Sequence, residues 1–234
     1  MQKAPYECEL HSHTVCSDGN DTPFELIENA AARGIRVLAL TDHDVIPPRE
    51  IELPSGEMRN FVEYAAERGI CLIPGVEFSC ETQIEDVHLI GLGCDWNAPE
   101  LAEQAGQIVA SKEEAYSETI RRLDERGYRM SLDEVLTVGN TKIPLAELQK
   151  KRIFDVLAQK GYAKDWSQAK LLVRDDPYFS VKRKKPPVLG IIDLVHRLGG
   201  IAILAHPYLI DETIEWQGET VDRWALLDAM IARG

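Results

Sequence analysis

The chain of 234 residues has no long hydrophobic run. No stretch approaches the roughly 18 consecutive apolar residues that a membrane-spanning helix needs. The first ten residues, MQKAPYECEL, also lack the apolar core of a secretory signal peptide. The sequence therefore predicts a protein without a membrane segment, located in the cytoplasm.

Cysteine is scarce and has no regular spacing. The five cysteines are odd in number and include no CxxC pair. This pattern argues against a disulfide framework and favours reduced thiols in a cytosolic protein.

Basic residues are outnumbered by acidic ones, 26 to 39, which gives a formal net charge of −13. A basic surface that binds nucleic acid broadly is therefore disfavoured, and we expect no stable nucleic-acid complex. A small anionic substrate stays compatible with this charge, because bound metal ions can reverse the field at a site. The sequence gives no indication of the oligomeric state.

Strand-like and helix-like segments alternate over the first hundred residues. YECELHSHT, IRVLALTDHD, ICLIPGVEFSCE and DVHLIGLGCD read as strands, and TPFELIENAAARG and NFVEYAAERG read as helices ending at glycine. Apolar strands separated by covering helices are typical of a mainly parallel α/β sheet or barrel.

The character of the chain changes between residues 97 and 185, where the sequence reads as helical throughout. The α/β rhythm returns with PVLGIIDLVHRLGG, IAILAHP and a last helix, RWALLDAMIARG. We therefore predict an α/β barrel domain formed by residues 1–96 and 186–234, with a helical insertion domain at residues 97–185.

The last helix leads to an expectation about how much of the barrel this chain contains. Each earlier helix that ends in ARG or ERG is followed at once by a strand, whereas none follows Gly234. The α/β part has about 145 residues, against roughly 200 or more for a complete barrel of eight units. From this we expect the C-terminal part of the barrel to be missing from the chain.

Five of the six histidines lie on or beside the strand-like runs, near carboxylates. His11 and His13 are two apart, so on a strand their side chains would point to one face. The carboxyl ends of parallel strands meet at one edge, where α/β proteins place their sites. The candidate ligands gathered there are His11, His13, Asp18, His43, Glu77, His88 and His206. His88 fits less well, because it comes early in its run.

Imidazole and carboxylate ligands without a thiolate pair suit Zn, Mn or Fe(II). There are too many candidates for one ion, so two or three ions are expected, with Glu77 bridging. Asp42 is expected to orient a metal ligand from outside the coordination sphere, whereas Asp44 reads as a turn residue. His196, within a helix, reads as a surface or capping residue.

The motifs HSHT with SDG, LTDHD, PGVEFS, VHLIGLG and LAHP occur in this order along the chain. In these motifs the sequence resembles the PHP (polymerase and histidinol phosphatase) phosphoesterases, most of all the stand-alone bacterial members with a helical insertion. The resemblance implies a distorted seven-stranded (β/α) barrel that holds three divalent metal ions (Mn, Fe or Zn).

The resemblance also implies a ligand set. His11, His13 and Glu77 would hold a first ion, Glu77 would bridge to a second ion held by His88 and His206, and Asp18 with His43 would hold a third. A final GSDxH motif, which completes the family pattern with an Asp and a His, does not occur in this sequence.

These residues indicate a metal-dependent phosphoesterase, an enzyme of the phosphoric ester hydrolase class. A hydroxide bridging two ions would attack phosphorus, with Glu77 positioning it and His206 as a second catalytic residue. The expected substrate is a small phosphorylated metabolite or nucleotide, as a monoester or a diester, five-membered cyclic phosphodiesters included. Basic residues in the insertion, Lys150, Lys151 and Arg152, are expected to bind a further part of the substrate.

Three other functions stay open at this point. One is a 5'-3' oligonucleotide exonuclease, and another is a catalytically inactive PHP module used for binding or regulation, which the absent GSDxH motif favours. The third is metal-dependent amide hydrolysis on a related barrel, for which the sequence shows no DxH arrangement at a late strand.

Overall fold

The computed structural model describes residues 6–80, 87–139, 141–216 and 218–234. Its contacts divide the chain into two compact units, one of Met1–Ala105 with Lys185–Gly234 and the other of Gly106–Lys184. The expected insertion at residues 97–185 stays a prediction.

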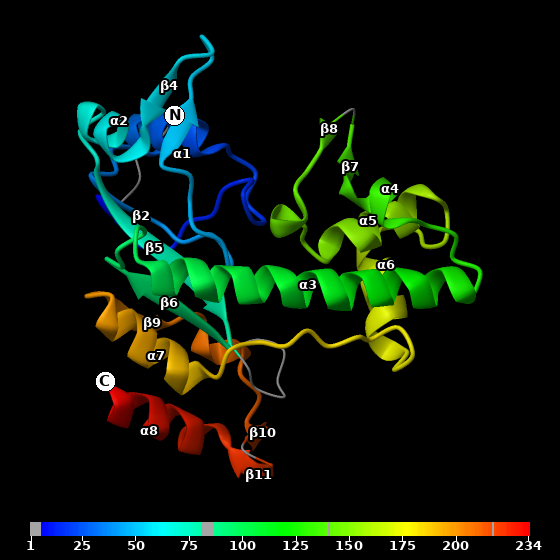
Figure 1. Cartoon of the computed structure of the whole chain (residues 1–234). Coiled ribbons are helices and arrows are strands. Elements are labelled where there is room, and N and C mark those ends of the chain that lie inside the picture. Colours follow the sequence, from blue (N-terminus) through cyan, green and yellow to red (C-terminus); the bar gives the residue numbers. More distant parts are fainter. Residues whose placement is uncertain (1–5, 81–86, 140, 217) are drawn as a thin grey trace. The chain divides into compact units, whose positions relative to one another are not determined.

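A five-stranded sheet forms the centre of the first unit, in the order β1-β2-β5-β6-β9 (Figure 1). Its strands are β1 (Cys8–Glu9), β2 (Val37–Leu40), β5 (Cys71–Ser79), β6 (His88–Leu92) and β9 (Ile201–Leu204). This is an α/β fold with a curled half-barrel sheet. The seven strands implied by the family resemblance stay a prediction.

The sheet is mixed rather than mainly parallel. β1, β2 and β5 pair in parallel, whereas β6 runs antiparallel to both β5 and β9. The start of β6 therefore lies beside the end of β5, with Ser79 opposite His88. The expectation that His88 is poorly placed was wrong, because it assumed a parallel strand.

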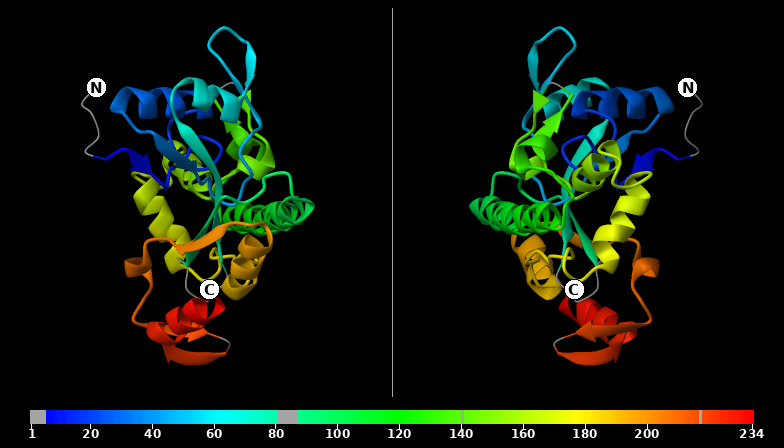
Figure 2. Two further views of the ribbon diagram at one scale, coloured as in Figure 1. Left: turned by 90° about the vertical axis from the view of Figure 1, so that its left-hand side faces the viewer. Right: turned by 90° about the vertical axis from the view of Figure 1, so that its right-hand side faces the viewer.

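Helices cover the sheet where the sequence predicts them. They are α1 (Pro23–Arg33), α2 (Phe61–Glu67), α7 (Val188–Arg197) and α8 (Arg223–Arg233). α1 begins at a capping box, in which Thr22 accepts from the Glu25 N–H and Glu25 reaches back to Thr22, and it ends at Gly34 in the left-handed conformation. α7 packs on β6 and β9, and α8 lies beside α7 (Figures 1 and 2).

Two hairpins in this unit had no clear signal in the sequence. β3 (Glu50–Glu52) pairs with β4 (Met58–Asn60), and β10 (Thr213–Trp216) pairs with β11 (Glu219–Asp222), both antiparallel. The first hairpin follows β2 and the second follows β9, so both belong to the connections at the carboxyl ends of strands.

The second unit is mainly helical and has a core of its own. α3 (Pro99–Glu125) enters this unit and is followed by α4 (Leu132–Leu136), α5 (Lys151–Gln159) and α6 (Trp166–Asp175). A short hairpin of β7 (Thr137–Val138) and β8 (Thr141–Lys142) departs from the expectation of helices alone. The core gathers buried side chains such as Leu123, Leu148, Ile153 and Leu157.

Among the described residues, no helix combines the length and the hydrophobicity that crossing a bilayer requires.

Candidate metal centre

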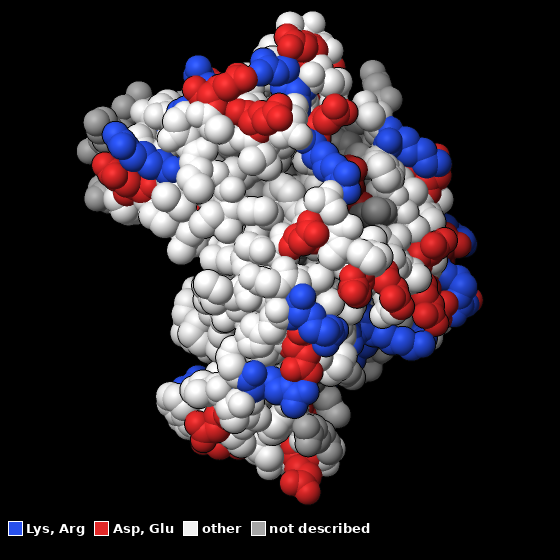
Figure 3. Space-filling model, turned by 60° about the vertical axis from the view of Figure 1, so that its left-hand side comes forward, with Lys and Arg blue, Asp and Glu red and all other residues white. Residues whose placement is uncertain are grey.

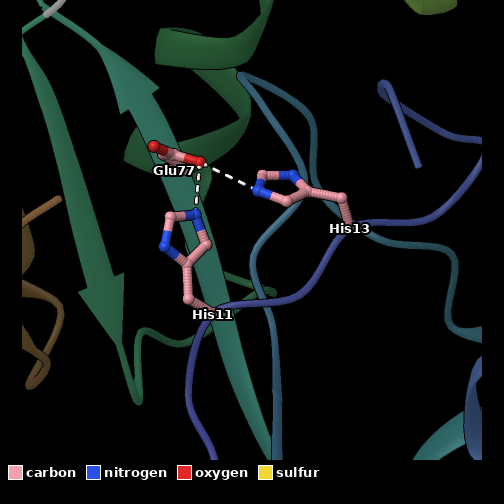
Figure 4. Close-up of side chains that lie close together, drawn as sticks. All are labelled: His11, His13 and Glu77. Carbon is pink, nitrogen blue, oxygen red and sulfur yellow. Dashed lines mark hydrogen bonds and ion pairs between the residues drawn. The ribbon is translucent and has the colours of Figure 1, made fainter. Parts of the chain in front are cut away.

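Glu77 on β5 is the centre of the site. Its side chain is 0 % exposed, and nitrogens of four imidazoles lie within hydrogen-bond distance of its oxygens. His11 Nε2 and His13 Nε2 lie 2.8 Å and 3.0 Å from Oε2, and Figure 4 shows both rings pointing toward this carboxylate. His88 Nδ1 and His206 Nε2 lie 3.1 Å and 3.0 Å from Oε1. One carboxylate thus joins histidines from β6, from the end of β9 and from the segment that follows β1.

Asp18 and His43 form the other side of the cluster. His43 Nε2 lies 3.7 Å from Asp18 Oδ2, and His43 Nδ1 lies 3.5 Å from Glu77 Oε2. His13 Nδ1 is 3.5 Å from Asp18 Oδ1. All seven residues that the sequence named as candidate ligands are therefore brought together.

The backbone explains why these residues meet. β1 ends at Glu9, so His11 and His13 do not lie on a strand as expected but on the irregular segment that follows it. Ser12, between them, donates its hydroxyl to the Ala39 carbonyl of β2, and its own carbonyl accepts from the Thr41 N–H. The segment therefore continues alongside β2, and both imidazoles still reach Glu77.

An isolated parallel β-bridge pairs His43 with Glu77, so the two residues lie opposite each other on neighbouring segments. His206 follows β9 directly and has a φ of 32°, which is rare for a residue with a side chain. Such strained conformations cluster at functional sites, where the surrounding structure enforces them.

Three overlapping sets of side chains have their ligand atoms within 4.8 Å of one another. The sets are His11, His13 and Glu77; His13, Asp18 and His43; and His43, Glu77 and His88. His206 joins the cluster through its contact with Glu77 and lies 3.3 Å from His88 Nδ1.

The electrostatics of the cluster centre on Glu77. Burial alone would raise the pKa of this carboxyl, but hydrogen bonds from His11, His13 and His88 outweigh it and lower the pKa well below the usual range. Burial likewise opposes protonation of His13, yet its hydrogen bond to Glu77 raises the pKa of His13 overall. At His43 burial prevails and lowers the pKa to about 4.

These side chains fit a cluster of divalent cations. Among the residues that the structure describes, the buried Nδ1 atoms of His43 and His206 find no hydrogen-bond partner, a state that native structures seldom leave unexplained. A fully buried carboxylate surrounded by imidazoles is a donor set suited to Zn, Mn or Fe(II). We therefore find the donor set and its geometry consistent with metal binding.

The sequence also predicts substrate contacts at Lys150, Lys151 and Arg152, and these residues belong to the second unit. Lys151 forms an ion pair with Asp155 at 3.0 Å, and its ammonium lies over the Trp166 ring at 5.8 Å. Arg152 donates to the Thr137 carbonyl at 2.8 Å. Their role in substrate binding stays a prediction.

Asp44 lies in a turn, as the sequence predicts, and its side chain is also bonded within the site. It has a φ of 59° and is only 2 % exposed, and its carboxylate accepts from both the N–H and the hydroxyl of Ser79. Its position directly after His43 was the one signal in the sequence that it could belong to the site.

A shallow cavity of about 410 Å³ opens beside the loop that carries Asp18. Cys16 and Thr22 line one side, and Ile51 and Leu53 of the β3–β4 hairpin line another. Both walls are connections that follow strands at the carboxyl edge of the sheet. The mainly apolar lining suits an organic group better than a phosphate.

The chain is similar to known proteins in sequence and in fold. Residues 9–168 match the family model described as "PHP domain". A 5'-3' exoribonuclease of Haemophilus influenzae is 30% identical over 89% of this chain and 71% of its own length. A 3',5'-nucleoside bisphosphate phosphatase of Chromobacterium violaceum is 29% identical over 97% of this chain and 74% of its own.

A third relative is the phosphoribosyl 1,2-cyclic phosphate 1,2-diphosphodiesterase of Eggerthella lenta. It is 27% identical over 87% of this chain and 74% of its own length. The three relatives thus differ in the phosphate compounds that their names describe.

Two solved structures have a similar fold. One is described as an amidohydrolase of Chromobacterium violaceum with bound sulfate and no metal; it has a TM-score of 0.74 and 26% identity over 98% of this chain and 75% of its own. The other is a candidate metal-dependent phosphoesterase of Bifidobacterium adolescentis, with a TM-score of 0.73 and 22% identity over 100% of this chain and 76% of its own.

Proposed function

The chain belongs to the PHP-domain family, and from this premise we propose that it hydrolyses phosphate esters with divalent ions held around Glu77. The observation that carries the proposal is the buried Glu77 carboxylate, contacted by four imidazoles and flanked by His43 and Asp18. The predicted enzyme class, a phosphoric ester hydrolase, is confirmed by the family and its named members.

The proposed ligands divide among three ions. His11, His13 and Glu77 hold the first ion; Glu77, His88 and His206 hold the second; Asp18 and His43 hold the third. The short distances from Glu77 to all four of its histidines support a bridging role for this carboxylate. The position of His13 within 3.5 Å of Asp18 supports a third ion next to the first.

Divalent ions at such a site supply an activated water near neutral pH and neutralise charge on the phosphoryl oxygens. The chain itself contributes orientation and a fixed charge. Because Glu77 is ionised well below neutral pH, it presents two negative oxygens to the site throughout the physiological range. His43 stays neutral above about pH 4, so its lone pair is available for a cation.

The proposed substrate is a small phosphorylated metabolite or nucleotide, as a monoester or a diester, cyclic phosphodiesters included. The names of two relatives, a nucleoside bisphosphate phosphatase and a cyclic phosphate diphosphodiesterase, support this range. On the face drawn in Figure 3, Lys and Arg are interspersed with Asp and Glu instead of forming a broad basic surface. That distribution favours a small ligand over a long nucleic acid.

Lys150, Lys151 and Arg152 remain the proposed contacts for a second group of the substrate. Guanidinium and ammonium groups suit a second phosphate. Within their own unit Lys151 and Arg152 already contact Asp155, which a substrate phosphate would have to displace or share.

The first test is metal content together with phosphate release. We expect the purified chain, loaded with Mn, Fe or Zn, to retain bound metal and to hydrolyse a panel of esters, releasing inorganic phosphate from monoesters and an alcohol with a phosphate monoester from diesters. Glu77→Gln should abolish turnover and lower the metal content, because an amide cannot bridge two cations as a carboxylate does. Glu57→Gln, at an exposed carboxylate on the β3–β4 hairpin, is the matched control and should behave as wild type.

Two results would contradict the proposal. One is a wild-type chain that binds no metal and hydrolyses no ester; the other is a folded Glu77→Gln variant with wild-type activity. Circular dichroism of each variant establishes that it is folded.

A second candidate activity is 5'-3' oligonucleotide hydrolysis, which the name of the Haemophilus influenzae relative supports. The same panel distinguishes the two when it includes short 5'-phosphorylated RNA. Stepwise release of mononucleotides from the 5' end favours the exonuclease, whereas release of inorganic phosphate alone favours the phosphatase.

A further inference from the structure

Two buried aspartates flank His43 in the sequence. Asp42 is 0 % exposed and Asp44 is 2 % exposed. Neither belongs to the proposed ligand set, and a buried carboxylate is costly unless its oxygens receive hydrogen bonds. The partners that satisfy these two carboxylates come from the segments that carry the other ligands.

Asp42 forms hydrogen bonds with the loop between His13 and Asp18. Its Oδ1 accepts from the Thr14 N–H at 2.7 Å and from the Ser17 hydroxyl at 2.6 Å, and its Oδ2 accepts from the Thr14 hydroxyl at 2.6 Å. Ser17 Oγ in turn lies 3.4 Å from His13 Nδ1. Since Ser17 gives its proton to Asp42, its oxygen is left to accept from His13 Nδ1–H.

Asp44 forms hydrogen bonds with β5 two residues beyond Glu77, at Ser79. Its Oδ1 accepts from the Ser79 N–H at 2.8 Å and its Oδ2 from the Ser79 hydroxyl at 2.9 Å. The backbone adds two bonds around Glu77 itself, because Asp44 N–H donates to the Glu77 carbonyl at 2.9 Å and Glu77 N–H donates to the Asp42 carbonyl at 3.2 Å. The positive φ of Asp44 turns the chain so that this side chain reaches Ser79.

We infer that Asp42 and Asp44 are positioning residues that join the three ligand-bearing segments, Asp42 by orienting His13 and Asp18, and Asp44 by orienting Glu77. This inference rests on the proposed function, since it assigns the two residues to the same metal centre. Asp42, His43 and Asp44 together are called the clasp below. His43 faces the site, Asp42 binds the loop between His13 and Asp18, and Asp44 binds the end of β5.

The consequence for His13 is a defined tautomer. A proton kept on Nδ1 by Ser17 leaves the lone pair on Nε2, the atom that lies 3.0 Å from Glu77 Oε2. Metal-binding histidines generally need such a partner on their other nitrogen, and its loss typically weakens metal affinity by about 10- to 100-fold.

The test compares alanine with asparagine at each position in the full chain loaded with Zn. Asparagine can keep every contact of Asp42, because its oxygen accepts from Thr14 N–H and Ser17 while its amide donates to the Thr14 hydroxyl. We expect Asp42→Ala to weaken Zn binding by about 10- to 100-fold in competition with a chelator. Asp42→Asn should stay within a few-fold of wild type. Asp228→Ala, at an exposed aspartate on α8, is the matched control.

Asp44 needs a control for its backbone conformation. Asp44→Gly tolerates the positive φ but removes the carboxylate, whereas Asp44→Asn keeps the side-chain bonds and also tolerates this conformation. We expect weaker Zn binding in Asp44→Gly and rescue in Asp44→Asn. Equal, wild-type affinity in both would overturn the assignment of Asp44.

A spectroscopic readout separates positioning from general support of the fold. The ¹⁵N chemical shifts of His13 should report an Nδ1–H tautomer in the wild type, and Ser17→Ala should lose or mix it. Ser17→Ala keeps the Asp42 bonds to Thr14, so it carries the test of Asp42 if Asp42→Ala does not fold. Unchanged Zn affinity and an unchanged His13 tautomer in Ser17→Ala would overturn the inference that Asp42 orients His13 through Ser17.

The failure of this inference can be told from the failure of the proposed function. A wild type that binds Zn, with clasp variants that bind it equally well, overturns the clasp alone. A wild type that binds no Zn overturns the proposed function. The clasp is then decided in the metal-free protein, where Asp42→Ala must accelerate amide exchange at Thr14 relative to Asp228→Ala to support it.

Discussion

His43 has a largely buried imidazole, and this makes the stability of the metal-free protein depend on pH. Burial lowers the pKa of His43 from 6.5 to about 4. An imidazole that stays neutral when folded binds a proton more readily when unfolded, so its contribution to stability falls as the pH drops from 6.5 towards 4. Between about pH 7 and about pH 5, the loss should be on the order of 2 kcal/mol.

The measurement is urea unfolding with a chelator present, comparing wild type with His43→Gln, which has no titrating group. His13 acts in the opposite direction, because its raised pKa stabilises the fold below 6.5 and that contribution is lost as the pH rises through the raised value. The comparison between the two proteins isolates His43. Parallel pH dependence in both would contradict the assigned shift.

At the residue scale, the sequence predicted the ligand side chains better than the residues that hold them. Histidines at strand ends are visible because few histidines occur and their placement has a chemical reason. Asp44 lies in a turn as predicted, but its bonds to Ser79 could not be predicted, because a buried and an exposed turn aspartate have the same local pattern and only the distant Ser79 distinguishes them.

At the scale of elements, the SDG turn is under close steric restraint. A Cβ added at Gly19 would lie 2.3 Å from the His13 carbonyl oxygen and 2.7 Å from the Thr14 nitrogen, both backbone atoms. Because backbone atoms cannot turn aside, Gly19→Ala should displace the turn and with it Asp18. We expect a loss of bound metal, largest for the ion assigned to Asp18 and His43.

The control for this change is Gly106→Ala, where an added Cβ would meet nothing within 4 Å. Metal content and activity of Gly106→Ala should equal those of wild type. A Gly19→Ala variant with the full metal content would show that the turn has more freedom than the contacts indicate.

The direction of β6 marks the limit of prediction for elements. Its apolar run is equally compatible with a parallel or an antiparallel neighbour, since both faces of the strand are covered. Pairing with β5 and β9 decides the direction, and it moves His88 to the same edge as Glu77 and His206. The helices were easier to predict, because Thr22 and Gly34 are local signals that need no distant partner.

At the scale of the whole chain, the structure has separate hydrophobic cores in its two compact units. The sequence changes in character near residues 97 and 185, whereas the contacts divide the chain at Gly106 and Lys184, and the insertion at residues 97–185 stays a prediction. The division within α3 could not be predicted, because the helix continues through it without an intervening loop.

Separate cores predict that the two units lose stability separately. Leu157 on α5 is 0 % exposed, and its replacement by Ala should cost about 2 to 5 kcal/mol within its own unit. Leu171 on α6 is 43% exposed, so Leu171→Ala is a matched control with a small effect.

Hydrogen exchange followed by mass spectrometry should show faster exchange in residues 106–184 of Leu157→Ala, while β5 and β6 keep their protection. Because those two strands carry Glu77 and His88, the metal content should also persist. Equal acceleration in both units would instead mean that the chain unfolds as one cooperative body, and the metal site would then depend on the packing of α5.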